Sequence, residues 1–116
     1  MIDVILKRFD NPDEVQVAEK SKFEIVNIGG MKIARATFQP GMRWSTHIGA
    51  TQGKTICDIE HIGVVLSGNF VVVMNGGKQF ELNEGDIFRI PPGHDGWVIG
   101  DKTYVSLHLL GPAISK

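Results

Sequence analysis

Turn-forming residues interrupt this chain of 116 residues at short intervals. Glycine, joined by Asn, Asp, Ser or Pro, supplies the backbone conformations that tight turns require. The interruptions lie at residues 27–30, 39–41, 67–69, 75–77, 83–85, 91–93 and 100–102. They predict roughly nine or ten short strands and no clear helix. Asn75-Gly76-Gly77 is a strong hairpin signal, because a type I′ turn needs positive φ at both central positions. Only residues 13–20 could be helical, and Val15 and Val17 are there at strand spacing.

The composition also favours a β fold. Ile, Val and Thr, whose branched side chains suit strands, together supply 29 residues. Hydrophobic residues make up 42% of the chain, which excludes a disordered protein. Many short antiparallel strands are typical of a closed barrel or a double-sheet jelly roll. The predicted fold class is therefore all-β, with the whole chain as a single domain.

Charge and cysteine content exclude several kinds of partner. The formal net charge is -1 and the basic residues are scattered, which gives no expectation of nucleic-acid binding. One cysteine cannot form an intrachain disulfide, so the chain suits a reducing compartment. No apolar run approaches the length that crosses a bilayer, and Asp3 interrupts the apolar N-terminus. We expect a cytoplasmic protein with no membrane partner.

The stretch most informative about chemistry runs from Gly41 to His61. In a strand with the usual period of two, Cys57, His61 and Gly63 fall on one face and Glu60 falls on the other. If that first face lines the interior, a thiol and an imidazole point inward together. Gly63, on the same face, has no side chain and so leaves space beside these two groups.

Two motifs in this region resemble those of the cupin family. The first is Gly41, five residues and His47, closed by His61, six residues and Gly68; it spans about 41–68. His61 stands where the family usually has glutamate. The segment between His47 and His61 is longer than the family pattern and brings Cys57 with it.

The second motif is Gly85, five residues, Pro91, one residue and Gly93, within about 85–96. Together the motifs span about half the chain. The resemblance implies a small single-domain cupin over residues 1–116, folded as a double-stranded β-helix, or jelly-roll barrel.

The sequence departs from the family at the residues that usually bind metal. Gly49 and Gly96 stand where the resemblance places two histidines, and a histidine occurs instead at His94. The donors that remain are two imidazoles and one thiolate, with His94 as a fourth, and we predict a metal site formed by His47, Cys57, His61 and His94. Such donors favour a divalent transition metal such as Zn, Fe or Ni. Four ligands would make a closed structural site, whereas three would leave a position for water or substrate.

Each candidate also has a simpler interpretation. His47 could cap a strand end, Cys57 could be a small buried apolar residue, and His94 could belong to a surface turn. His108 is expected to be a satisfied sheet histidine, and Glu60 could replace His61 only through a β-bulge. The aromatic residues that could line a pocket above the site are Trp44, Trp97, Phe88 and Tyr104.

Two functional hypotheses follow. The first is a metal-dependent cupin enzyme acting on a small molecule, with a reaction such as dioxygenation or isomerisation implied by the resemblance. The second is a non-catalytic ligand-binding or sensing module, suggested by the loss of two customary ligand positions; a pocket that has lost its activity is a third possibility. Under either of the two hypotheses we expect a homodimer, with apolar segments 2–6 and 23–28 covering or extending a sheet edge.

Overall fold

A computed structural model describes residues 3–112 of the chain. Within them lie nine strands, a single helical turn, α1 (Trp44–His47), and a 3₁₀ turn, η1 (Gly49–Gln52). The strands are β1 (Glu14–Ala18), β2 (Ser21–Ile28), β3 (Met31–Phe38), β4 (His61–Ser67), β5 (Asn69–Met74), β6 (Gln79–Leu82), β7 (Ile87–Ile90), β8 (His94–Ile99) and β9 (Tyr104–Pro112). The part of the chain that the structure describes contains no helix with the length and hydropathy of a membrane span.

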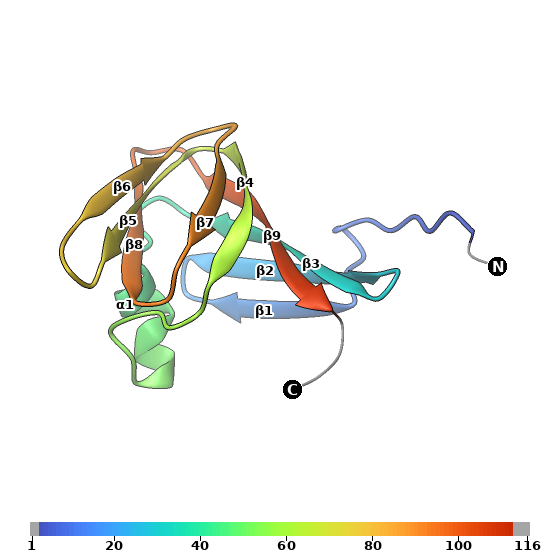
Figure 1. Cartoon of the computed structure of the whole chain (residues 1–116), viewed down its shortest axis with the longest axis horizontal. Helices are drawn as coiled ribbons and strands as arrows, with labels where there is room; N and C mark the ends of the chain where they lie inside the picture. Colours follow the sequence, from blue (N-terminus) through green and yellow to red (C-terminus); the bar gives the residue numbers. More distant parts are fainter. Residues whose placement is uncertain (1–2, 113–116) are drawn as a thin grey trace.

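The strands form two antiparallel sheets that face each other (Figure 1). The larger sheet has the order β1-β2-β3-β9-β4-β7, and the smaller has the order β6-β5-β8. Chain neighbours β4 and β5 lie in different sheets, as do β6 and β7, and β8 and β9. Repeated exchange between the sheets is the arrangement of a jelly roll, so the all-β prediction is confirmed.

Turn chemistry explains where two of the hairpins form. Gly29 and Gly30, both with positive φ (58° and 86°), make the two-residue connection between β2 and β3. The β5–β6 connection differs from the predicted type I′ turn, because it is four residues long. Of its two glycines only Gly77 has positive φ (96°), and its N–H donates to the Met74 carbonyl. This is the longer loop in which a left-handed residue follows an ordinary turn.

The segment between the first three strands and β4 is the main difference from the predicted pattern. Residues 55–60 were expected to continue the strand, but β4 begins only at His61. Cys57 instead forms an isolated bridge with His94. The short helix α1 was not expected, whereas β1 confirms the strand spacing of Val15 and Val17.

Two apolar segments were expected to cover or extend a sheet edge. Segment 23–28 lies in β2, which is hydrogen-bonded on both sides by β1 and β3 and so is no edge. Of segment 2–6, residue 2 lies outside the described residues, and residues 3–6 are an exposed extension rather than part of a sheet. The homodimer that these segments suggested stays a prediction.

Inward-facing side chains divide the barrel interior into two parts. On each of three strands, the inward-facing side chains form a row that includes a histidine. These histidines, which lie at the same end of the interior, are His61 on β4, His94 on β8 and His108 on β9. At the other end Phe38, Phe70 and Tyr104 pack ring against ring, with centroids 4.9–5.8 Å apart. The aromatic end belongs to the hydrophobic core, and the histidine end holds the candidate site.

Candidate metal centre

Backbone hydrogen bonds bring the Cys57 loop to the start of β8. The Cys57 N–H donates to the His94 carbonyl at 2.7 Å, and the Gly93 N–H donates to the Cys57 carbonyl at 2.8 Å. Cys57 is buried by this contact. The bridge therefore places the Cys57 thiol beside His94. The thiol also lies beside His61, the first residue of β4, which follows Cys57 by four residues.

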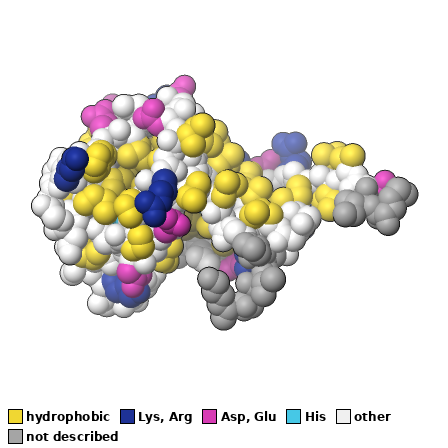
Figure 2. All heavy atoms as spheres, viewed as in Figure 1, with side chains coloured by type: hydrophobic (Ala, Val, Ile, Leu, Met, Phe, Trp, Pro, Cys, Tyr) yellow, Lys and Arg dark blue, Asp and Glu magenta, His cyan; other side chains and the backbone are white. Residues whose placement is uncertain are grey.

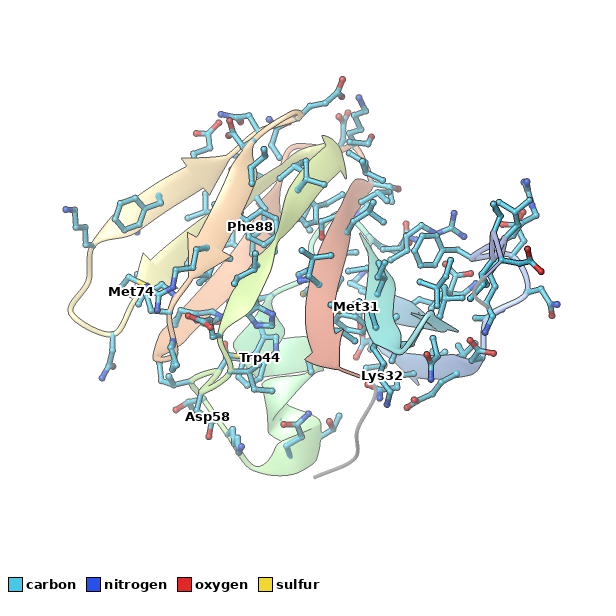
Figure 3. The ribbon with its side chains drawn as sticks, turned by 45° about the vertical axis from the view of Figure 1, so that its right-hand side comes forward. Met31, Lys32, Trp44, Asp58, Met74 and Phe88 are labelled. Atoms are coloured by element: carbon cyan, nitrogen blue, oxygen red, sulfur yellow. The ribbon has the colours of Figure 1, made fainter. Side chains whose placement is uncertain are left out.

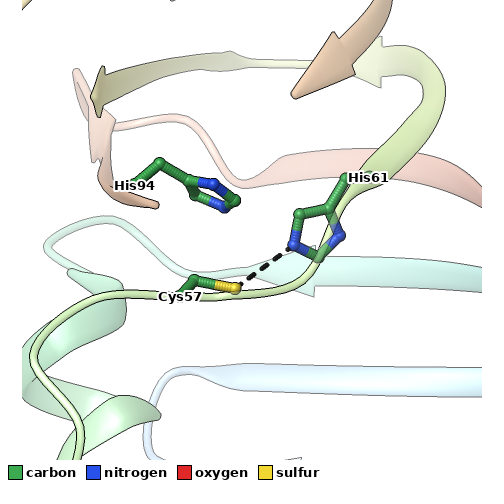
Figure 4. A group of neighbouring side chains, drawn as sticks. All are labelled: Cys57, His61 and His94. Atoms are coloured by element: carbon green, nitrogen blue, oxygen red, sulfur yellow. Dashed lines mark hydrogen bonds between the residues drawn. The ribbon is translucent and has the colours of Figure 1, made fainter. Parts of the chain in front are cut away.

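Cys57, His61 and His94 converge on a single point (Figure 4). The Cys57 Sγ lies 3.5 Å from the His61 Nε2, and one donor atom from each residue lies within 4.8 Å of the others. Ligand bonds of about 2.0–2.3 Å in a tetrahedral zinc site put donor atoms roughly 3.3–3.8 Å apart. The Cys57–His61 separation lies within this range, whereas separations of up to 4.8 Å require the side chains to turn toward one another before all three could hold one ion.

The hydrogen bond of His94 fixes which of its nitrogens can bind. Its Nδ1 lies 2.8 Å from the Pro91 carbonyl oxygen. Because that oxygen only accepts, the Nδ1 must carry the proton, which leaves the lone pair on Nε2. Metal-binding histidines are commonly oriented in this way by a carbonyl or carboxylate.

Burial sets the protonation states of the three groups. Desolvation, assisted by the nearby His94, lowers the pKa of His61 to about 4, and desolvation also lowers the pKa of His94. Both imidazoles are therefore neutral at pH 7, which is the form that coordinates metals. Burial raises the pKa of the Cys57 thiol. Metal binding must then displace the thiol proton, as it does in other thiolate sites.

His108 lies beside this cluster. Its ring centroid is 5.4 Å from that of His61, and its Nε2 is 2.8 Å from the Ser106 Oγ. Burial lowers its pKa to about 4. It has the hydrogen bond expected of a satisfied sheet histidine, but it also lines the interior. The alternation of Tyr104, Ser106 and His108 along β9 is the sequence signal that could have indicated this position.

His47 lies outside the cluster. It ends α1, where its Nδ1 accepts from the Arg43 N–H at 3.0 Å and its Nε2 lies 3.8 Å from the Glu19 carboxylate. A helical turn, rather than the strand end that its motif suggests, directs the imidazole away from the other donors. Glu60 is likewise outside: it pairs with Arg89 at 2.6 Å, and no bulge brings it into the position of His61.

Aromatic rings fill the two places where the resemblance would put further ligands. A Cβ at Gly96 would lie 2.5 Å from the Phe70 ring, and a Cβ at Gly49 would lie 2.5 Å from the Trp44 ring. Real Cβ atoms do not approach other atoms so closely. The usual ligand set of the family cannot form in this packing, and the Cys57, His61 and His94 cluster is a different set.

Two cavities adjoin the cluster. The inner one, about 50 Å³, is lined by His61, His94 and His108 and by aromatic and aliphatic side chains that include Trp44, Phe88 and Tyr104. Figure 3 shows Phe88 between β7 and β4, and Trp44 beside the lower end of β4. Trp97 lies outside this cavity, with the Arg43 guanidinium 4.3 Å from its ring.

The outer cavity is an apolar groove of about 500 Å³ between β6 and β7. In Figure 2 it is the hydrophobic hollow that lies between two groups of basic side chains. Lys78 and Arg89 are among its lining residues, and Val72, Phe88 and Ile90 line both cavities. These three side chains separate the groove from the histidine end of the barrel.

Comparison with known proteins agrees with this architecture. Residues 36–104, which include both motifs, match the family model described as the EutQ-like cupin domain. The chain belongs to the cupin superfamily. The search of curated proteins found no significant match.

Several solved cupin-like structures share the fold at low sequence identity. KdgF from Halomonas sp. is 19% identical, with a TM-score of 0.66, and the match covers 98% of this chain and 97% of that one. A cupin described as a sugar phosphate isomerase, from Silicibacter pomeroyi, is 15% identical over 92% and 74% of the two chains, with a TM-score of 0.65. Ectoine synthase from P. lautus is 9% identical over 97% and 80%, with a TM-score of 0.71. At these identities the likeness shows the fold alone.

Proposed function

We propose that this cupin binds one divalent transition metal ion through Cys57, His61 and His94 and presents it to a small molecule in the barrel. The observation that carries the proposal is the convergence of three nitrogen and sulfur donors within 4.8 Å at one end of the interior. Donors of this type favour Zn, Fe or Ni over Mg or Ca. The site needs a reduced thiol, which supports a cytoplasmic location.

Three protein ligands leave a position open. His108 is held by Ser106, and His47 lies at the end of α1, so neither joins the donor group. Three-ligand sites with an open position are typical of catalytic rather than structural metals. A metal bound here would supply Lewis acidity to an oxygen atom of water or of the small molecule. His61 and His94 would contribute neutral imidazoles, while Phe88 and Trp44 exclude bulk water.

The size of the interior limits what can reach the open position. A cavity of about 50 Å³ holds one or a few water-sized groups. The groove of about 500 Å³ is large enough for the body of a metabolite. We therefore place the bulk of the small molecule in the groove, with one polar group reaching the metal once the Phe88 ring, which lies in the wall between the two cavities, moves aside.

Zinc binding by equilibrium dialysis tests the proposal. The protein should take up one equivalent of Zn²⁺, and Cys57→Ser together with His94→Gln should lower uptake below a tenth of an equivalent. His47→Gln is the matched control, because it removes an imidazole outside the cluster and should leave binding unchanged. Retained binding in the double variant, or loss in the control, would contradict the assignment.

A non-catalytic ligand-binding or sensing module is the second candidate. It is favoured by the inner cavity, whose described lining holds no carboxylate to serve as an acid or base. Incubation of the zinc-loaded protein with a panel of sugar phosphates, the substrate class named for one structural neighbour, separates the two functions. Conversion that is lost with Cys57→Ser supports an enzyme, whereas a raised melting temperature with unchanged compound supports the binding module.

A further inference from the structure

The inner cavity holds a polar group that the three proposed metal ligands do not use. His108 is buried, and its Nε2 lies 2.8 Å from the Ser106 Oγ. Its Nδ1 has no hydrogen-bond partner among residues 3–112, yet it is not one of the polar atoms that the fold seals from solvent without a partner. The Nδ1 therefore faces the cavity of about 50 Å³ that the His108 ring lines together with His61 and His94.

Ser106 allows this nitrogen to be a hydrogen-bond donor. A serine hydroxyl can donate as well as accept, so the Ser106 Oγ can donate to the Nε2 while the neutral ring carries its proton on Nδ1. Ser106 is fully buried, and the ring centroids of Phe88 and His61 lie 5.5 and 5.4 Å from that of His108. These neighbours fix the orientation of the imidazole. An acceptor oxygen in the cavity therefore meets an N–H group whose direction is already set.

The charge of the metal-loaded site favours an anion. A divalent ion brings two positive charges and the Cys57 thiolate removes one, while imidazole ligands are neutral, so one positive charge remains. The described lining of the inner cavity includes no carboxylate that could balance this charge. Because an unbalanced buried charge is costly, a ligand with a single negative charge stabilises the site more than a neutral ligand does.

The outer groove is basic at the end nearest the cluster. Lys78 lines the groove there: its carbonyl accepts from the Met74 N–H at 2.8 Å, and Met74 pairs with His94 across β5 and β8. The Lys78 Nζ lies 5.3 Å from the centre of the Phe80 ring, which also lines the groove. The ammonium group thus lies over apolar surface, at the end from which the cluster is approached.

The opposite end of the groove is apolar and acidic. Residues 83–86 join β6 to β7 there, and Leu82 lines this end together with Glu81 and Asp86. These two carboxylates repel a second anion. The groove therefore suits a ligand that has one anionic group at the cluster end and an apolar body extending toward the other end.

We propose that the ligand is a monocarboxylate with an apolar body, an inference that rests on the proposed metal centre. One carboxylate oxygen occupies the open position on the metal, and the other accepts from the His108 Nδ1. A carboxylate has three heavy atoms, which suits a cavity that holds one or a few water-sized groups. The apolar body lies in the groove once the Phe88 ring has moved aside, and Lys78 attracts the anion to the cluster end.

Isothermal titration calorimetry with the zinc-loaded protein tests the ligand class. The probes are octanoate, 1-octanol, which lacks the charge, acetate, which lacks the apolar body, and suberate, which adds a second carboxylate at the far end of the same eight-carbon chain. Octanoate should bind at least tenfold more tightly than each of the other three. Any of the three that binds as tightly as octanoate would overturn the inference. This series uses the wild type and needs no variant to fold.

The variant His108→Leu tests the second carboxylate contact. It should still take up one equivalent of zinc but bind octanoate at least tenfold more weakly, because the Nδ1 donor is missing. His47→Gln is the matched control, since it removes an imidazole outside the cavity and should leave octanoate binding unchanged. Full octanoate affinity in a folded His108→Leu protein, or lost affinity in His47→Gln, would overturn the inference.

Cobalt in place of zinc shows whether the carboxylate reaches the metal. Octanoate should change the visible absorption bands of the cobalt-loaded wild type, and 1-octanol should leave them unchanged. Bands that octanoate does not alter would overturn the inference.

Zinc uptake separates the failure of this inference from the failure of the proposed function. One equivalent of bound zinc without octanoate binding would overturn the ligand class and leave the metal centre in place. Absence of zinc uptake would overturn both.

Discussion

Of the glycines in this chain, Gly63 is the one at which an added side chain would be most crowded. A Cβ there would collide with the Leu107 carbonyl and lie 2.9 Å from the Phe88 ring. The strands β4 and β9 pair at this point, opposite His108. The missing side chain thus lets Phe88 pack against the sheet and close the wall between groove and interior.

We predict that Gly63→Ala lowers the free energy of unfolding by about 1–3 kcal/mol, because the β9 backbone or the Phe88 ring must shift. Urea denaturation measures the change. Gly76→Ala is the control, since nothing lies within 4 Å of its Cβ and its φ is not positive. If Gly63→Ala lowers the free energy of unfolding no more than Gly76→Ala does, the sheet accommodates the added methyl group without strain.

Buried histidines predict how stability depends on pH. The folded-state pKa values of His61 and His108, about 4, lie below the ordinary value of 6.5. The unfolded chain therefore binds more protons between these values, and stability is complete above pH 6.5 and falls as the pH drops toward 4. Each group accounts for up to about 3 kcal/mol.

Urea midpoints of the metal-free protein at pH 7.5 and pH 5 check this prediction. The midpoint should fall on acidification, and His108→Leu should reduce the fall, because one of the two neutral imidazoles is removed. A midpoint that is equal at both pH values would contradict the buried, neutral histidines.

At the scale of single residues, the sequence predicted positions on a strand better than positions in a motif. The alternation of Cys57, His61 and Gly63 correctly placed His61 and Gly63 on the inward face of β4. His47, selected by its motif spacing, lies in a helical turn instead. Strand periodicity predicts which face of the sheet a side chain is on. Motif spacing predicts a residue's position only where the local backbone follows the same course as in the rest of the family.

At the scale of elements, α1 depends on a carboxylate from a distant part of the chain. Asp95 on β8 accepts hydrogen bonds from the Ser45 N–H at 3.0 Å and the Ser45 Oγ at 2.7 Å. It also pairs with Arg43 at 3.2 Å. A four-residue helix has no stability of its own, so these contacts hold α1 against the sheet.

Asp95→Asn should lower the free energy of unfolding by about 1–3 kcal/mol, because the amide cannot replace the charge-assisted contacts to Ser45 and Arg43. Hydrogen exchange should show faster amide exchange at Thr46 and His47, whose N–H groups bond to the Arg43 carbonyl. Asp101→Asn, at an exposed turn, is the matched control. Unchanged protection in α1 would show that other contacts hold it.

Dependence on residues distant in sequence also explains which elements could be predicted from the sequence and which could not. The strands outside residues 41–60 follow from local alternation and turn residues, as β1 and the Gly29-Gly30 hairpin show. Residues 41–60 do not, because α1 is fixed by Asp95 and Cys57 by its bridge to His94, both distant in sequence. No periodicity in a single sequence records such contacts.

At the scale of the whole molecule, the barrel separates a hydrophobic core from a polar end. The aromatic cluster of Phe38, Phe70 and Tyr104 fills one end, while Cys57, His61 and His94 occupy the other. The jelly roll could be predicted from composition and motifs. The replacement of the family's ligands by aromatic packing could not, because it depends on where Phe70 and Trp44 place their rings.

Metal binding should stabilise the whole barrel, because the three ligands come from a loop and two strands that only folding brings together. Zinc at a free concentration of 100 times its dissociation constant should add about 2.7 kcal/mol, and chelation should remove this gain. Thermal unfolding with and without zinc measures the effect. An equal gain in Cys57→Ser would show that zinc stabilises the barrel from another site.

X-ray absorption at the zinc edge of the loaded protein tests the central claim most directly. One sulfur at about 2.3 Å and two imidazole nitrogens at about 2.0–2.1 Å are the predicted protein ligands. In Cys57→Ser the sulfur shell should disappear, while His47→Gln should leave the spectrum unchanged. A spectrum of the wild type without a sulfur ligand, or one altered by His47→Gln, would contradict the Cys57, His61 and His94 centre.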